Sequence, residues 1–189
     1  MNVSEMTHDD IADFAAERLR TMGYKFTCSN LTSRKHREQP DALGINTKGR
    51  SILVEVKTSR ADFFADKKKP FREKPSKGIG DIRVYLTTKG LVKPEEVPYG
   101  WMLWEVHGKA KPTLKVIKGK AKNIVKMNGK NRTEWTYVNC DEKEYLYMKR
   151  SSRKNYQKEV SWLMKIITRA MADGFEPNDY ANNYQKNKK

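Results

Sequence analysis

The stretch SILVEVKT, residues 51–58, carries the strongest strand signal in this 189-residue sequence. It is rich in β-branched and apolar residues and follows a glycine-containing turn, so it predicts a buried central strand. Successive side chains of a strand alternate between its two faces. Glu55 and Lys57 are therefore expected on one face, with Val54 and Val56 on the other. Charged side chains are rarely buried without a partner or a metal, so this pair indicates a candidate site.

The elements around this strand predict an α/β fold in which helices flank a mixed β-sheet. A helix is expected over residues 7–22, strands over 24–33, 41–45, 83–88 and 101–107, and a short helix after Ser59 that ends before Pro70. The first helix has apolar residues at helical spacing and Gly23 just beyond its end. Three strands in succession and a helical crossover give the order α-β-β-β-α-β.

The region after residue 107 is expected to form a C-terminal extension that packs on this core. Residues 109–150 fit either a β-hairpin around Asn128-Gly129 or a partly helical segment. A long helix is predicted over 153–172, with one apolar face formed by Tyr156, Val160, Leu163, Ile167 and Met171 and broadened by Trp162 and Ile166. That face is wide enough to close the core or to form a homodimer. The expected division is a core at 1–107, an extension at 108–174 and a disordered polar tail at 175–189.

The charge of the chain indicates the class of its partner. The sequence has 39 Lys and Arg against 23 Asp and Glu, which gives a net charge of +16. Such a balance speaks to partners and not to fold, and it favours nucleic acid. The first residues are polar and acidic, and no run approaches the roughly 18 apolar residues of a membrane span. A cytoplasmic protein without a membrane partner is therefore expected.

The tripeptide Asp/Glu-x-Lys gains meaning only from its setting, because it occurs three times in this chain. The occurrences start at Glu55, Asp66 and Asp141. Only the first falls within a predicted strand. That strand comes directly after the one that begins at the dipeptide Pro40-Asp41. A turn joins the two strands, so Asp41 is expected beside Glu55. The alternative is a solvated Glu–Lys pair, with Asp41 serving as a turn residue after Pro40.

Two carboxylates beside a lysine suit metal-assisted hydrolysis of a phosphodiester. Mg²⁺ prefers oxygen ligands and is commonly held by one or two carboxylates. It polarises a phosphoryl oxygen and helps to ionise water. Asp41 and Glu55 are the expected ligands of Mg²⁺ or Mn²⁺, with the backbone carbonyl of Val56 as a third oxygen. Lys57 is expected to orient or activate the attacking water, or to stabilise developing negative charge.

The segments PDALGI, residues 40–45, and SILVEVKTSRADFFADKKKP, residues 51–70, resemble the PD-(D/E)xK nuclease superfamily. Within it, the chain is similar to the MmcB-like DNA-repair nucleases and to related phage-borne proteins. The likeness rests on Asp41, Glu55 and Lys57, followed by Ser59, Arg60, Asp62, Phe63, Asp66 and Lys67 in that order. It implies a restriction-endonuclease-like core, cleavage of DNA, and a bacterial or phage-infected cell.

The resemblance also implies a further metal ligand. In many members of the superfamily an acidic residue of the first helix joins the metal site, and Glu17 is the candidate here. An exposed helix residue near Arg18 and Arg20 is the alternative reading of Glu17.

Basic residues follow the candidate site along the chain and predict a surface for DNA. Thirteen Lys and Arg lie between Lys48 and Lys93, against five acidic residues. Phosphate contacts are expected from Arg60, Lys67, Lys68, Lys69, Arg72, Lys74 and Lys77. A solvated face with a mobile loop is the alternative. Trp135 and Tyr137 lie among lysines and could stack on unpaired bases, although core packing is the favoured expectation.

Two functions follow from these features. The first is a Mg²⁺- or Mn²⁺-dependent endonuclease or exonuclease acting on DNA. The second is a nucleic-acid-binding protein with a nuclease-like fold, which serves as an adaptor in DNA repair, recombination or phage biology without cutting. Retention of all three motif residues, Asp41, Glu55 and Lys57, favours the enzyme.

Overall fold

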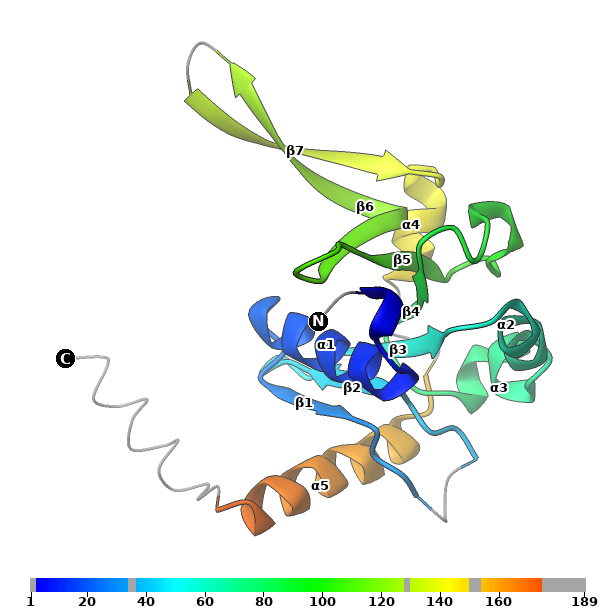
Figure 1. Ribbon diagram of the computed structural model, residues 1–189. Helices are drawn as coiled ribbons and strands as arrows, with labels where there is room; N and C mark the ends of the chain where they lie inside the picture. Colours follow the sequence, from blue (N-terminus) through cyan, green and yellow to red (C-terminus); the bar gives the residue numbers. More distant parts are fainter. Residues whose placement is uncertain (1–2, 34–36, 128–129, 150–153, 175–189) are drawn as a thin grey trace.

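A seven-stranded mixed sheet forms the centre of the computed structural model (Figure 1). The structure describes residues 3–33, 37–127, 130–149 and 154–174. The strands lie in the sheet in the order in which they occur in the chain. The pairs β3–β4 and β4–β5 are parallel and the other four pairs are antiparallel. Helices flank this sheet, so the chain has the α/β architecture with a mixed sheet that the sequence predicts.

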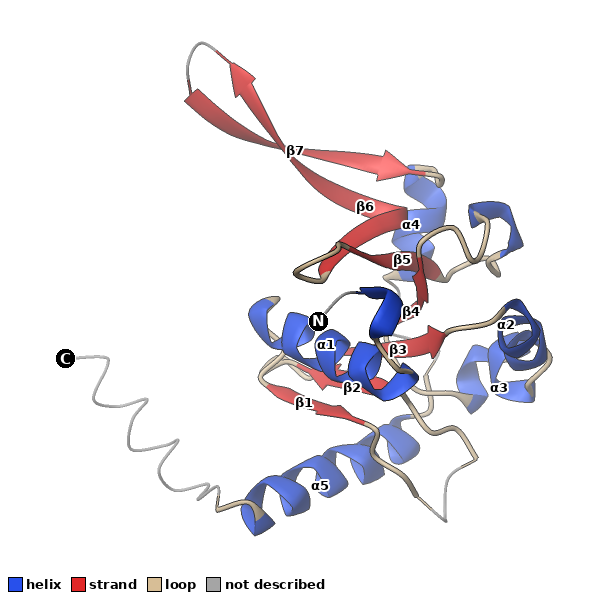
Figure 2. Ribbon diagram, in the orientation of Figure 1, coloured by secondary structure: helices blue, strands red, loops and turns tan. Residues whose placement is uncertain are grey.

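Figure 2 shows how helices and strands alternate along the chain. The strands are β1 Phe26–Ser29, β2 Ala42–Ile45, β3 Ser51–Lys57, β4 Ile82–Thr88, β5 Met102–His107, β6 Thr113–Met127 and β7 Lys130–Val138. The helices are α1 His8–Thr21, α2 Arg60–Lys67, α3 Pro70–Glu73, α4 Glu142–Met148 and α5 Tyr156–Ala172, with 3₁₀ turns at Val3–Glu5, Pro75–Lys77 and Pro94–Glu96. Strand β1 is shorter than predicted, because Asn30 adopts a positive φ of 51° directly after it.

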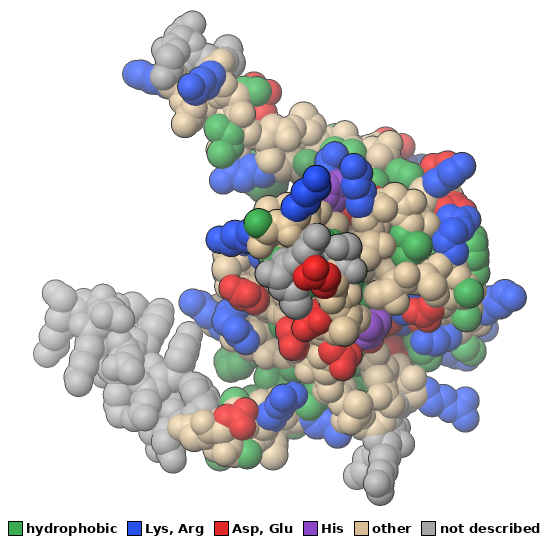
Figure 3. Space-filling view, viewed as in Figure 1, with side chains coloured by type: hydrophobic (Ala, Val, Ile, Leu, Met, Phe, Trp, Pro, Cys, Tyr) green, Lys and Arg blue, Asp and Glu red, His purple; other side chains and the backbone are tan. Residues whose placement is uncertain are grey.

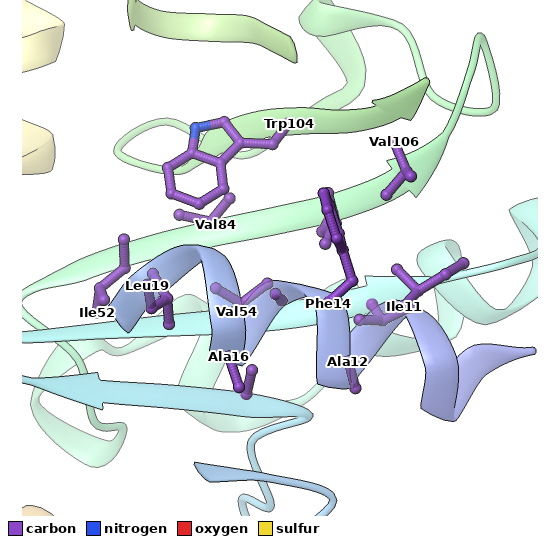
Figure 4. Packing of buried hydrophobic residues seen from close by; sticks show 14 of the residues in the cluster. Ile11, Ala12, Phe14, Ala16, Leu19, Ile52, Val54, Val84, Trp104 and Val106 are labelled. Carbon is purple, nitrogen blue, oxygen red and sulfur yellow. The ribbon is translucent and has the colours of Figure 1, made fainter. Parts of the chain in front are cut away.

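Helix α1 covers one face of the sheet. Thr7 caps it through a capping box with Asp10. Its apolar stripe, which includes Ile11 and Leu19, packs against the side chains that β3, β4 and β5 direct to this face, among them Val54 and Trp104 (Figure 4). The part of this face that α1 covers is hydrophobic, and the charged side chains of β3 are absent from it.

Helices α2 and α5 cover the opposite face. Phe63 of α2 and Trp162 of α5 are fully buried there against Leu53, Tyr85 and other apolar residues of the strands. Leu53 and the candidate-site residues of β3 alternate with Val54 and Val56, as strand geometry requires. The predicted separation of the two charged residues from the two valines is therefore confirmed by the way in which the two core clusters divide.

The buried face of α5 differs from the predicted apolar stripe. Trp162 and Ile166, which were expected only to broaden that stripe, are the residues that enter the core. Tyr156, Val160 and Met171 are each more than half exposed. The helix is rotated in this way because Glu159, one turn before Trp162 and Leu163, is also buried and carries a polar network. The predicted homodimer through this helix stays a prediction.

A buried polar network fastens α5 to the start of β3. The Lys154 ammonium pairs with Asp81 Oδ2 at 2.7 Å and with the carboxylate of Glu159. Ser51 donates its hydroxyl to Glu159 Oε2 at 2.7 Å, and its backbone N–H donates to Asp81 Oδ2 at 2.8 Å. Gly80 donates its N–H to the same Glu159 oxygen at 3.1 Å. The network joins three elements at the end of β3 that lies away from Glu55 and Lys57.

Strands β6 and β7 form the hairpin that was one of the two readings of residues 109–150. The first part of β6 pairs with β5 in the main sheet, and its second part pairs with β7 alone in an arm that projects from the body (Figure 1). The expected boundary at residue 107 thus falls between two paired strands, β5 and β6. Helix α4 follows the arm. The Asn128-Gly129 turn and the tail at 175–189 lie outside the described residues.

Pro70 begins helix α3, whereas the sequence predicted only that it would end the preceding helix. Proline is tolerated at the first helical position because its missing N–H would have no partner there.

In the described part of the chain, no helix combines the length and the hydropathy that crossing a bilayer demands.

Replacing Lys154 by Met should reduce the free energy of unfolding by about 3–5 kcal/mol, because two buried carboxylates lose their cation. Urea unfolding followed by circular dichroism measures the change. Lys143→Met, at an exposed position of α4, is the matched control and should change stability by less than about 0.5 kcal/mol. A loss below about 1 kcal/mol for Lys154→Met would show that the network contributes little to holding α5.

Candidate active site

The antiparallel pairing of β2 and β3 brings the three motif residues together. Ala42 pairs with Val54, so Asp41, the residue just before β2, lies beside Glu55. Asp41 Oδ2 accepts a hydrogen bond of 2.7 Å from the backbone N–H of Val56. The Lys57 Nζ lies 4.0 Å from Asp41 Oδ2 and 3.6 Å from Glu55 Oε2. Two carboxylates from neighbouring strands therefore face one ammonium group.

Helix α2 adds two carboxylates that the sequence interpretation did not include in the site. Asp62 Oδ2 and Asp66 Oδ1 lie 3.5 Å and 3.9 Å from Lys57 Nζ. The two residues are four apart, so they lie on the same side of the helix. That spacing, directly after the strand that carries Lys57, is the signal that could have identified them. The Asp66 tripeptide was set aside as a chance recurrence, although Asp66 is part of the site.

Arg72 is the largest correction to the predicted surface. It was expected to contact DNA phosphates, but its side chain is 2% exposed. Its Nη1 lies 2.7 Å from Glu38 Oε1, its Nη2 lies 2.8 Å from Glu55 Oε1, and its Nε lies 2.7 Å from Asp66 Oδ2. A buried guanidinium whose nitrogens meet three carboxylates is not available to phosphate, so the prediction for Arg72 is wrong.

Of the other predicted phosphate contacts, three have polar partners within the chain. Arg60 forms a bidentate ion pair with Glu96, with nitrogen–oxygen distances of 2.6 Å and 3.0 Å. Lys67 donates to the carbonyl of Glu96, and Lys69 pairs with Asp66 at 2.6 Å. Lys68, Lys74 and Lys77 are exposed, and so is Lys69 despite its ion pair. These three, with the partly free Lys69, form the part of the predicted surface that remains open to a phosphate.

Further side chains hold the carboxylates in place. Tyr85 donates its hydroxyl to Asp66 Oδ2 at 2.9 Å, and the backbone N–H of Ile79 donates to Glu38 Oε2 at 2.8 Å. His8, at the start of α1, places Nε2 3.5 Å from Asp41 Oδ2. Nothing in the spacing of Glu38 or His8 in the sequence indicates that they reach the site, because both arrive there through loops and helix packing.

Burial and neighbouring charges determine the protonation of the site. Burial raises the pKa of Glu55 to about 7, and the carboxylates of Asp41 and Asp66 add to the rise while Arg72 and Lys57 oppose it. Burial lowers the pKa of Lys57, but the four carboxylates around it outweigh this and raise it. The predicted role of Lys57 as a base would require a lowered pKa. The lysine is therefore a charged donor.

Asp66 responds in the opposite sense to Glu55. Burial raises the pKa of Asp66, but hydrogen bonds from Arg72 and the charge of Lys57 outweigh that effect and hold it well below its ordinary value. Asp66 is thus a permanent anion that fixes the two cations, whereas Glu55 is the carboxyl whose charge responds near neutral pH.

The predicted oxygen donors differ in how they are positioned. The N–H of Val56 points at Asp41, and the N–H and C=O of one strand residue face the same side, so its carbonyl is directed toward Asp41. Glu17 is exposed on α1, the helix that covers the opposite face of the sheet. It lies nine residues beyond His8, about 13 Å along the helix axis. The structure does not bring Glu17 to the other three donors.

The donor set of Asp41, Glu55 and the Val56 carbonyl is compatible with a hard divalent cation, which takes oxygen ligands and retains several waters. Glu55 Oε1 is buried and pairs with Arg72 by charge, yet no well-aligned hydrogen bond reaches it. That oxygen has unused capacity to accept. Among the described residues, no group of three or more His, Cys, Asp or Glu side chains is arranged as a metal site, so a cation here would depend on two carboxylates.

The raised pKa of Glu55 predicts that this residue costs stability at neutral pH. The folded state keeps a proton between pH 4.5 and about 7 that the unfolded chain releases, so stability falls as pH rises through this window. Glu55→Gln should therefore gain stability relative to the wild type as pH rises from 5 to 8, by up to about 3 kcal/mol. Urea unfolding without divalent cations measures it.

The exposed substitution Glu134→Gln is the control and should show no such trend. If the difference between Glu55→Gln and the wild type is constant from pH 5 to pH 8, the protonation assigned to Glu55 is incorrect.

Comparisons with known proteins assign no function to this site. No protein-family model matches the chain. No curated protein matches it either. Among solved structures, the chain is similar to the "SPO1766 protein of unknown function" from Silicibacter pomeroyi, with a TM-score of 0.48 and 17% sequence identity over 90% of this chain and 94% of that chain. A likeness of this degree assigns neither a fold family nor an activity.

Proposed function

We propose that this chain is a metal-dependent nuclease that hydrolyses phosphodiester bonds of DNA, built on a restriction-endonuclease-like core. One observation carries the proposal. Asp41 and Glu55 reach Lys57 from the ends of two paired strands, with both carboxylates within 4.0 Å of its ammonium group. The resemblance of residues 40–70 to the PD-(D/E)xK superfamily supports the same assignment.

In this proposal Asp41, Glu55 and the carbonyl of Val56 hold Mg²⁺ or Mn²⁺. When bound, the cation supplies polarisation of the phosphoryl oxygen and activation of water. Lys57 stays protonated, donates a hydrogen bond to the attacking water and stabilises negative charge that develops on the phosphate. Arg72 fixes the orientation of Glu55 from behind and does not contact the substrate.

The charge around Lys57 favours a cation. Among the described residues, the four carboxylates that face its ammonium outnumber the lysine and arginine side chains paired with them, which are Lys57, Lys69 and Arg72. A divalent cation beside Glu55 would favour the ionised carboxylate and lower its pKa. Metal binding would thus remove the proton that the Glu55 carboxyl keeps near neutral pH.

A specific observation favours the second function, a nucleic-acid-binding protein that does not cut. Glu55 and Asp66 are already paired with Arg72 and Lys57, and buried ion pairs of this kind can exist for structural reasons. The net charge of +16 serves binding in either case. Metal-dependent cleavage distinguishes the two functions.

Asp41→Ala and Lys57→Ala should each reduce cleavage of plasmid and linear single-stranded DNA in Mg²⁺ by at least about 10²-fold, with DNA binding retained. Gel assays measure cleavage, and EDTA should abolish it in the wild type. Glu17→Ala is the matched acidic control and should retain activity, because Glu17 lies on the other side of the sheet. Cleavage that persists in both site variants would contradict the assignment, and no metal-dependent product on any substrate would favour the adaptor.

A further inference from the structure

The arm formed by β6 and β7 presents a face on which lysines alternate with large apolar side chains. Residues paired across two antiparallel strands lie on the same face. On one face of the arm these pairs are Lys120 with Tyr137, Lys122 with Trp135, and Ile124 with Thr133. Lys126 continues the same face by strand alternation. Together these residues form the arm face.

The apolar side chains of the arm face are exposed. Trp135 is 58% exposed and Ile124 is 68% exposed. The other three tryptophans of the chain are at most 6% exposed, in the core. Tyr137 and Trp135 were both expected in the core, but the arm projects beyond it. Trp135 is accessible there, whereas the ring of Tyr137 packs against Tyr145 and lies beneath the Lys120 ammonium. Exposed aromatic groups on a projecting element mark an interaction surface.

The charge of the arm selects the kind of partner. Between Lys109 and Val138 the chain has nine Lys and Arg and a single acidic residue, Glu134. Half of the net charge of +16 therefore lies in this segment. Figure 3 shows Lys and Arg side chains along the projecting arm and around its base. Such a surface attracts a polyanion and repels a basic partner.

A groove of about 780 Å³ runs from the arm to the body of the protein. Its walls include Arg18, Tyr24, Trp104, Lys120, Lys122 and Trp135. Trp104 belongs to the core layer beneath α1, so the groove opens on the face of the sheet opposite Glu55 and Lys57. A ligand in it would be held away from the candidate active site.

We propose that the arm face binds single-stranded nucleic acid. A base stacks on Trp135, and Lys120, Lys122 and Lys126 contact the phosphates. Aromatic faces stack on bases only where the bases are unpaired. Lysines contact the backbone without regard to sequence. The combination therefore favours a single strand over a duplex. The site needs no metal and does not depend on the proposed cleavage.

Tryptophan fluorescence tests the proposal, since Trp135 is the exposed one of the four tryptophans. A 20-nucleotide oligothymidylate, added to the full chain in EDTA, should quench the emission. Trp135→Phe should bind about as tightly without quenching, because it removes the reporter and keeps an aromatic ring. Trp135→Ala should weaken binding by about 5- to 100-fold in fluorescence anisotropy, the loss expected for one stacked base.

Matched variants and a duplex make the test specific. Tyr99→Ala, at a 57% exposed aromatic outside the arm, should leave binding unchanged. Lys122→Ala should lower the slope of log K against log salt by about 0.7, the value for one phosphate contact on a single strand. A 20-base-pair duplex should lose less than twofold in affinity with Trp135→Ala.

Three results would overturn the proposal: quenching that persists in Trp135→Phe, unchanged affinity of Trp135→Ala, or an equal loss for strand and duplex. Circular dichroism of each variant confirms that the fold is intact. The same assay in the Asp41→Ala background should give the same result, so a failure of the nuclease assignment leaves this test readable.

Discussion

The guanidinium of Arg72 holds three carboxylates that the chain brings from three separate places. Glu38 comes from the loop before β2, Glu55 from the centre of the sheet, and Asp66 from α2. A buried ion pair that loses one partner costs about 3–5 kcal/mol, so each of these acids depends on the cation. The position of the Lys57 ammonium depends on this arrangement, because Glu55 and Asp66 are two of the groups that surround it.

A buried charge cluster of this kind requires a rigid apolar surround. The Arg72 guanidinium lies 5.0 Å from the centre of the Trp101 ring and 4.7 Å from that of Phe71. Trp101 in turn stacks on Tyr85 at 4.5 Å, and Tyr85 donates to Asp66. The aromatic residues thus fix the same groups that the ion pairs orient. The raised pKa of Glu55 shows that ionising this buried carboxyl costs stability.

Local patterns predicted the strands and the motif residues, and failed where long-range packing decides. The alternation in residues 51–58 was sufficient to place Glu55 and Lys57 on one face, and the turn at Gly49 was sufficient to pair Asp41 with them. A basic run gave no sign that Arg72 would be buried while Lys68 stayed exposed, because that depends on Glu38 and Glu55, which are distant in the sequence, as well as on the nearby Asp66. For α5 the helical period was predicted correctly, but the wrong face was predicted to be buried. The buried face is the one that carries the polar residue Glu159.

The order of the strands has a consequence for how this chain folds. Every strand pairs with the one made just before it, so the sheet can grow from β1 toward β7 by successive closures of short segments. Closing a short segment costs little chain entropy, and proteins dominated by such contacts fold fast. Helix α5 is an exception, because Lys154, just before it, meets Ser51 across 103 residues. Because α5 follows β7 in the chain, its buried residues can complete the core only after the last strand has been synthesised.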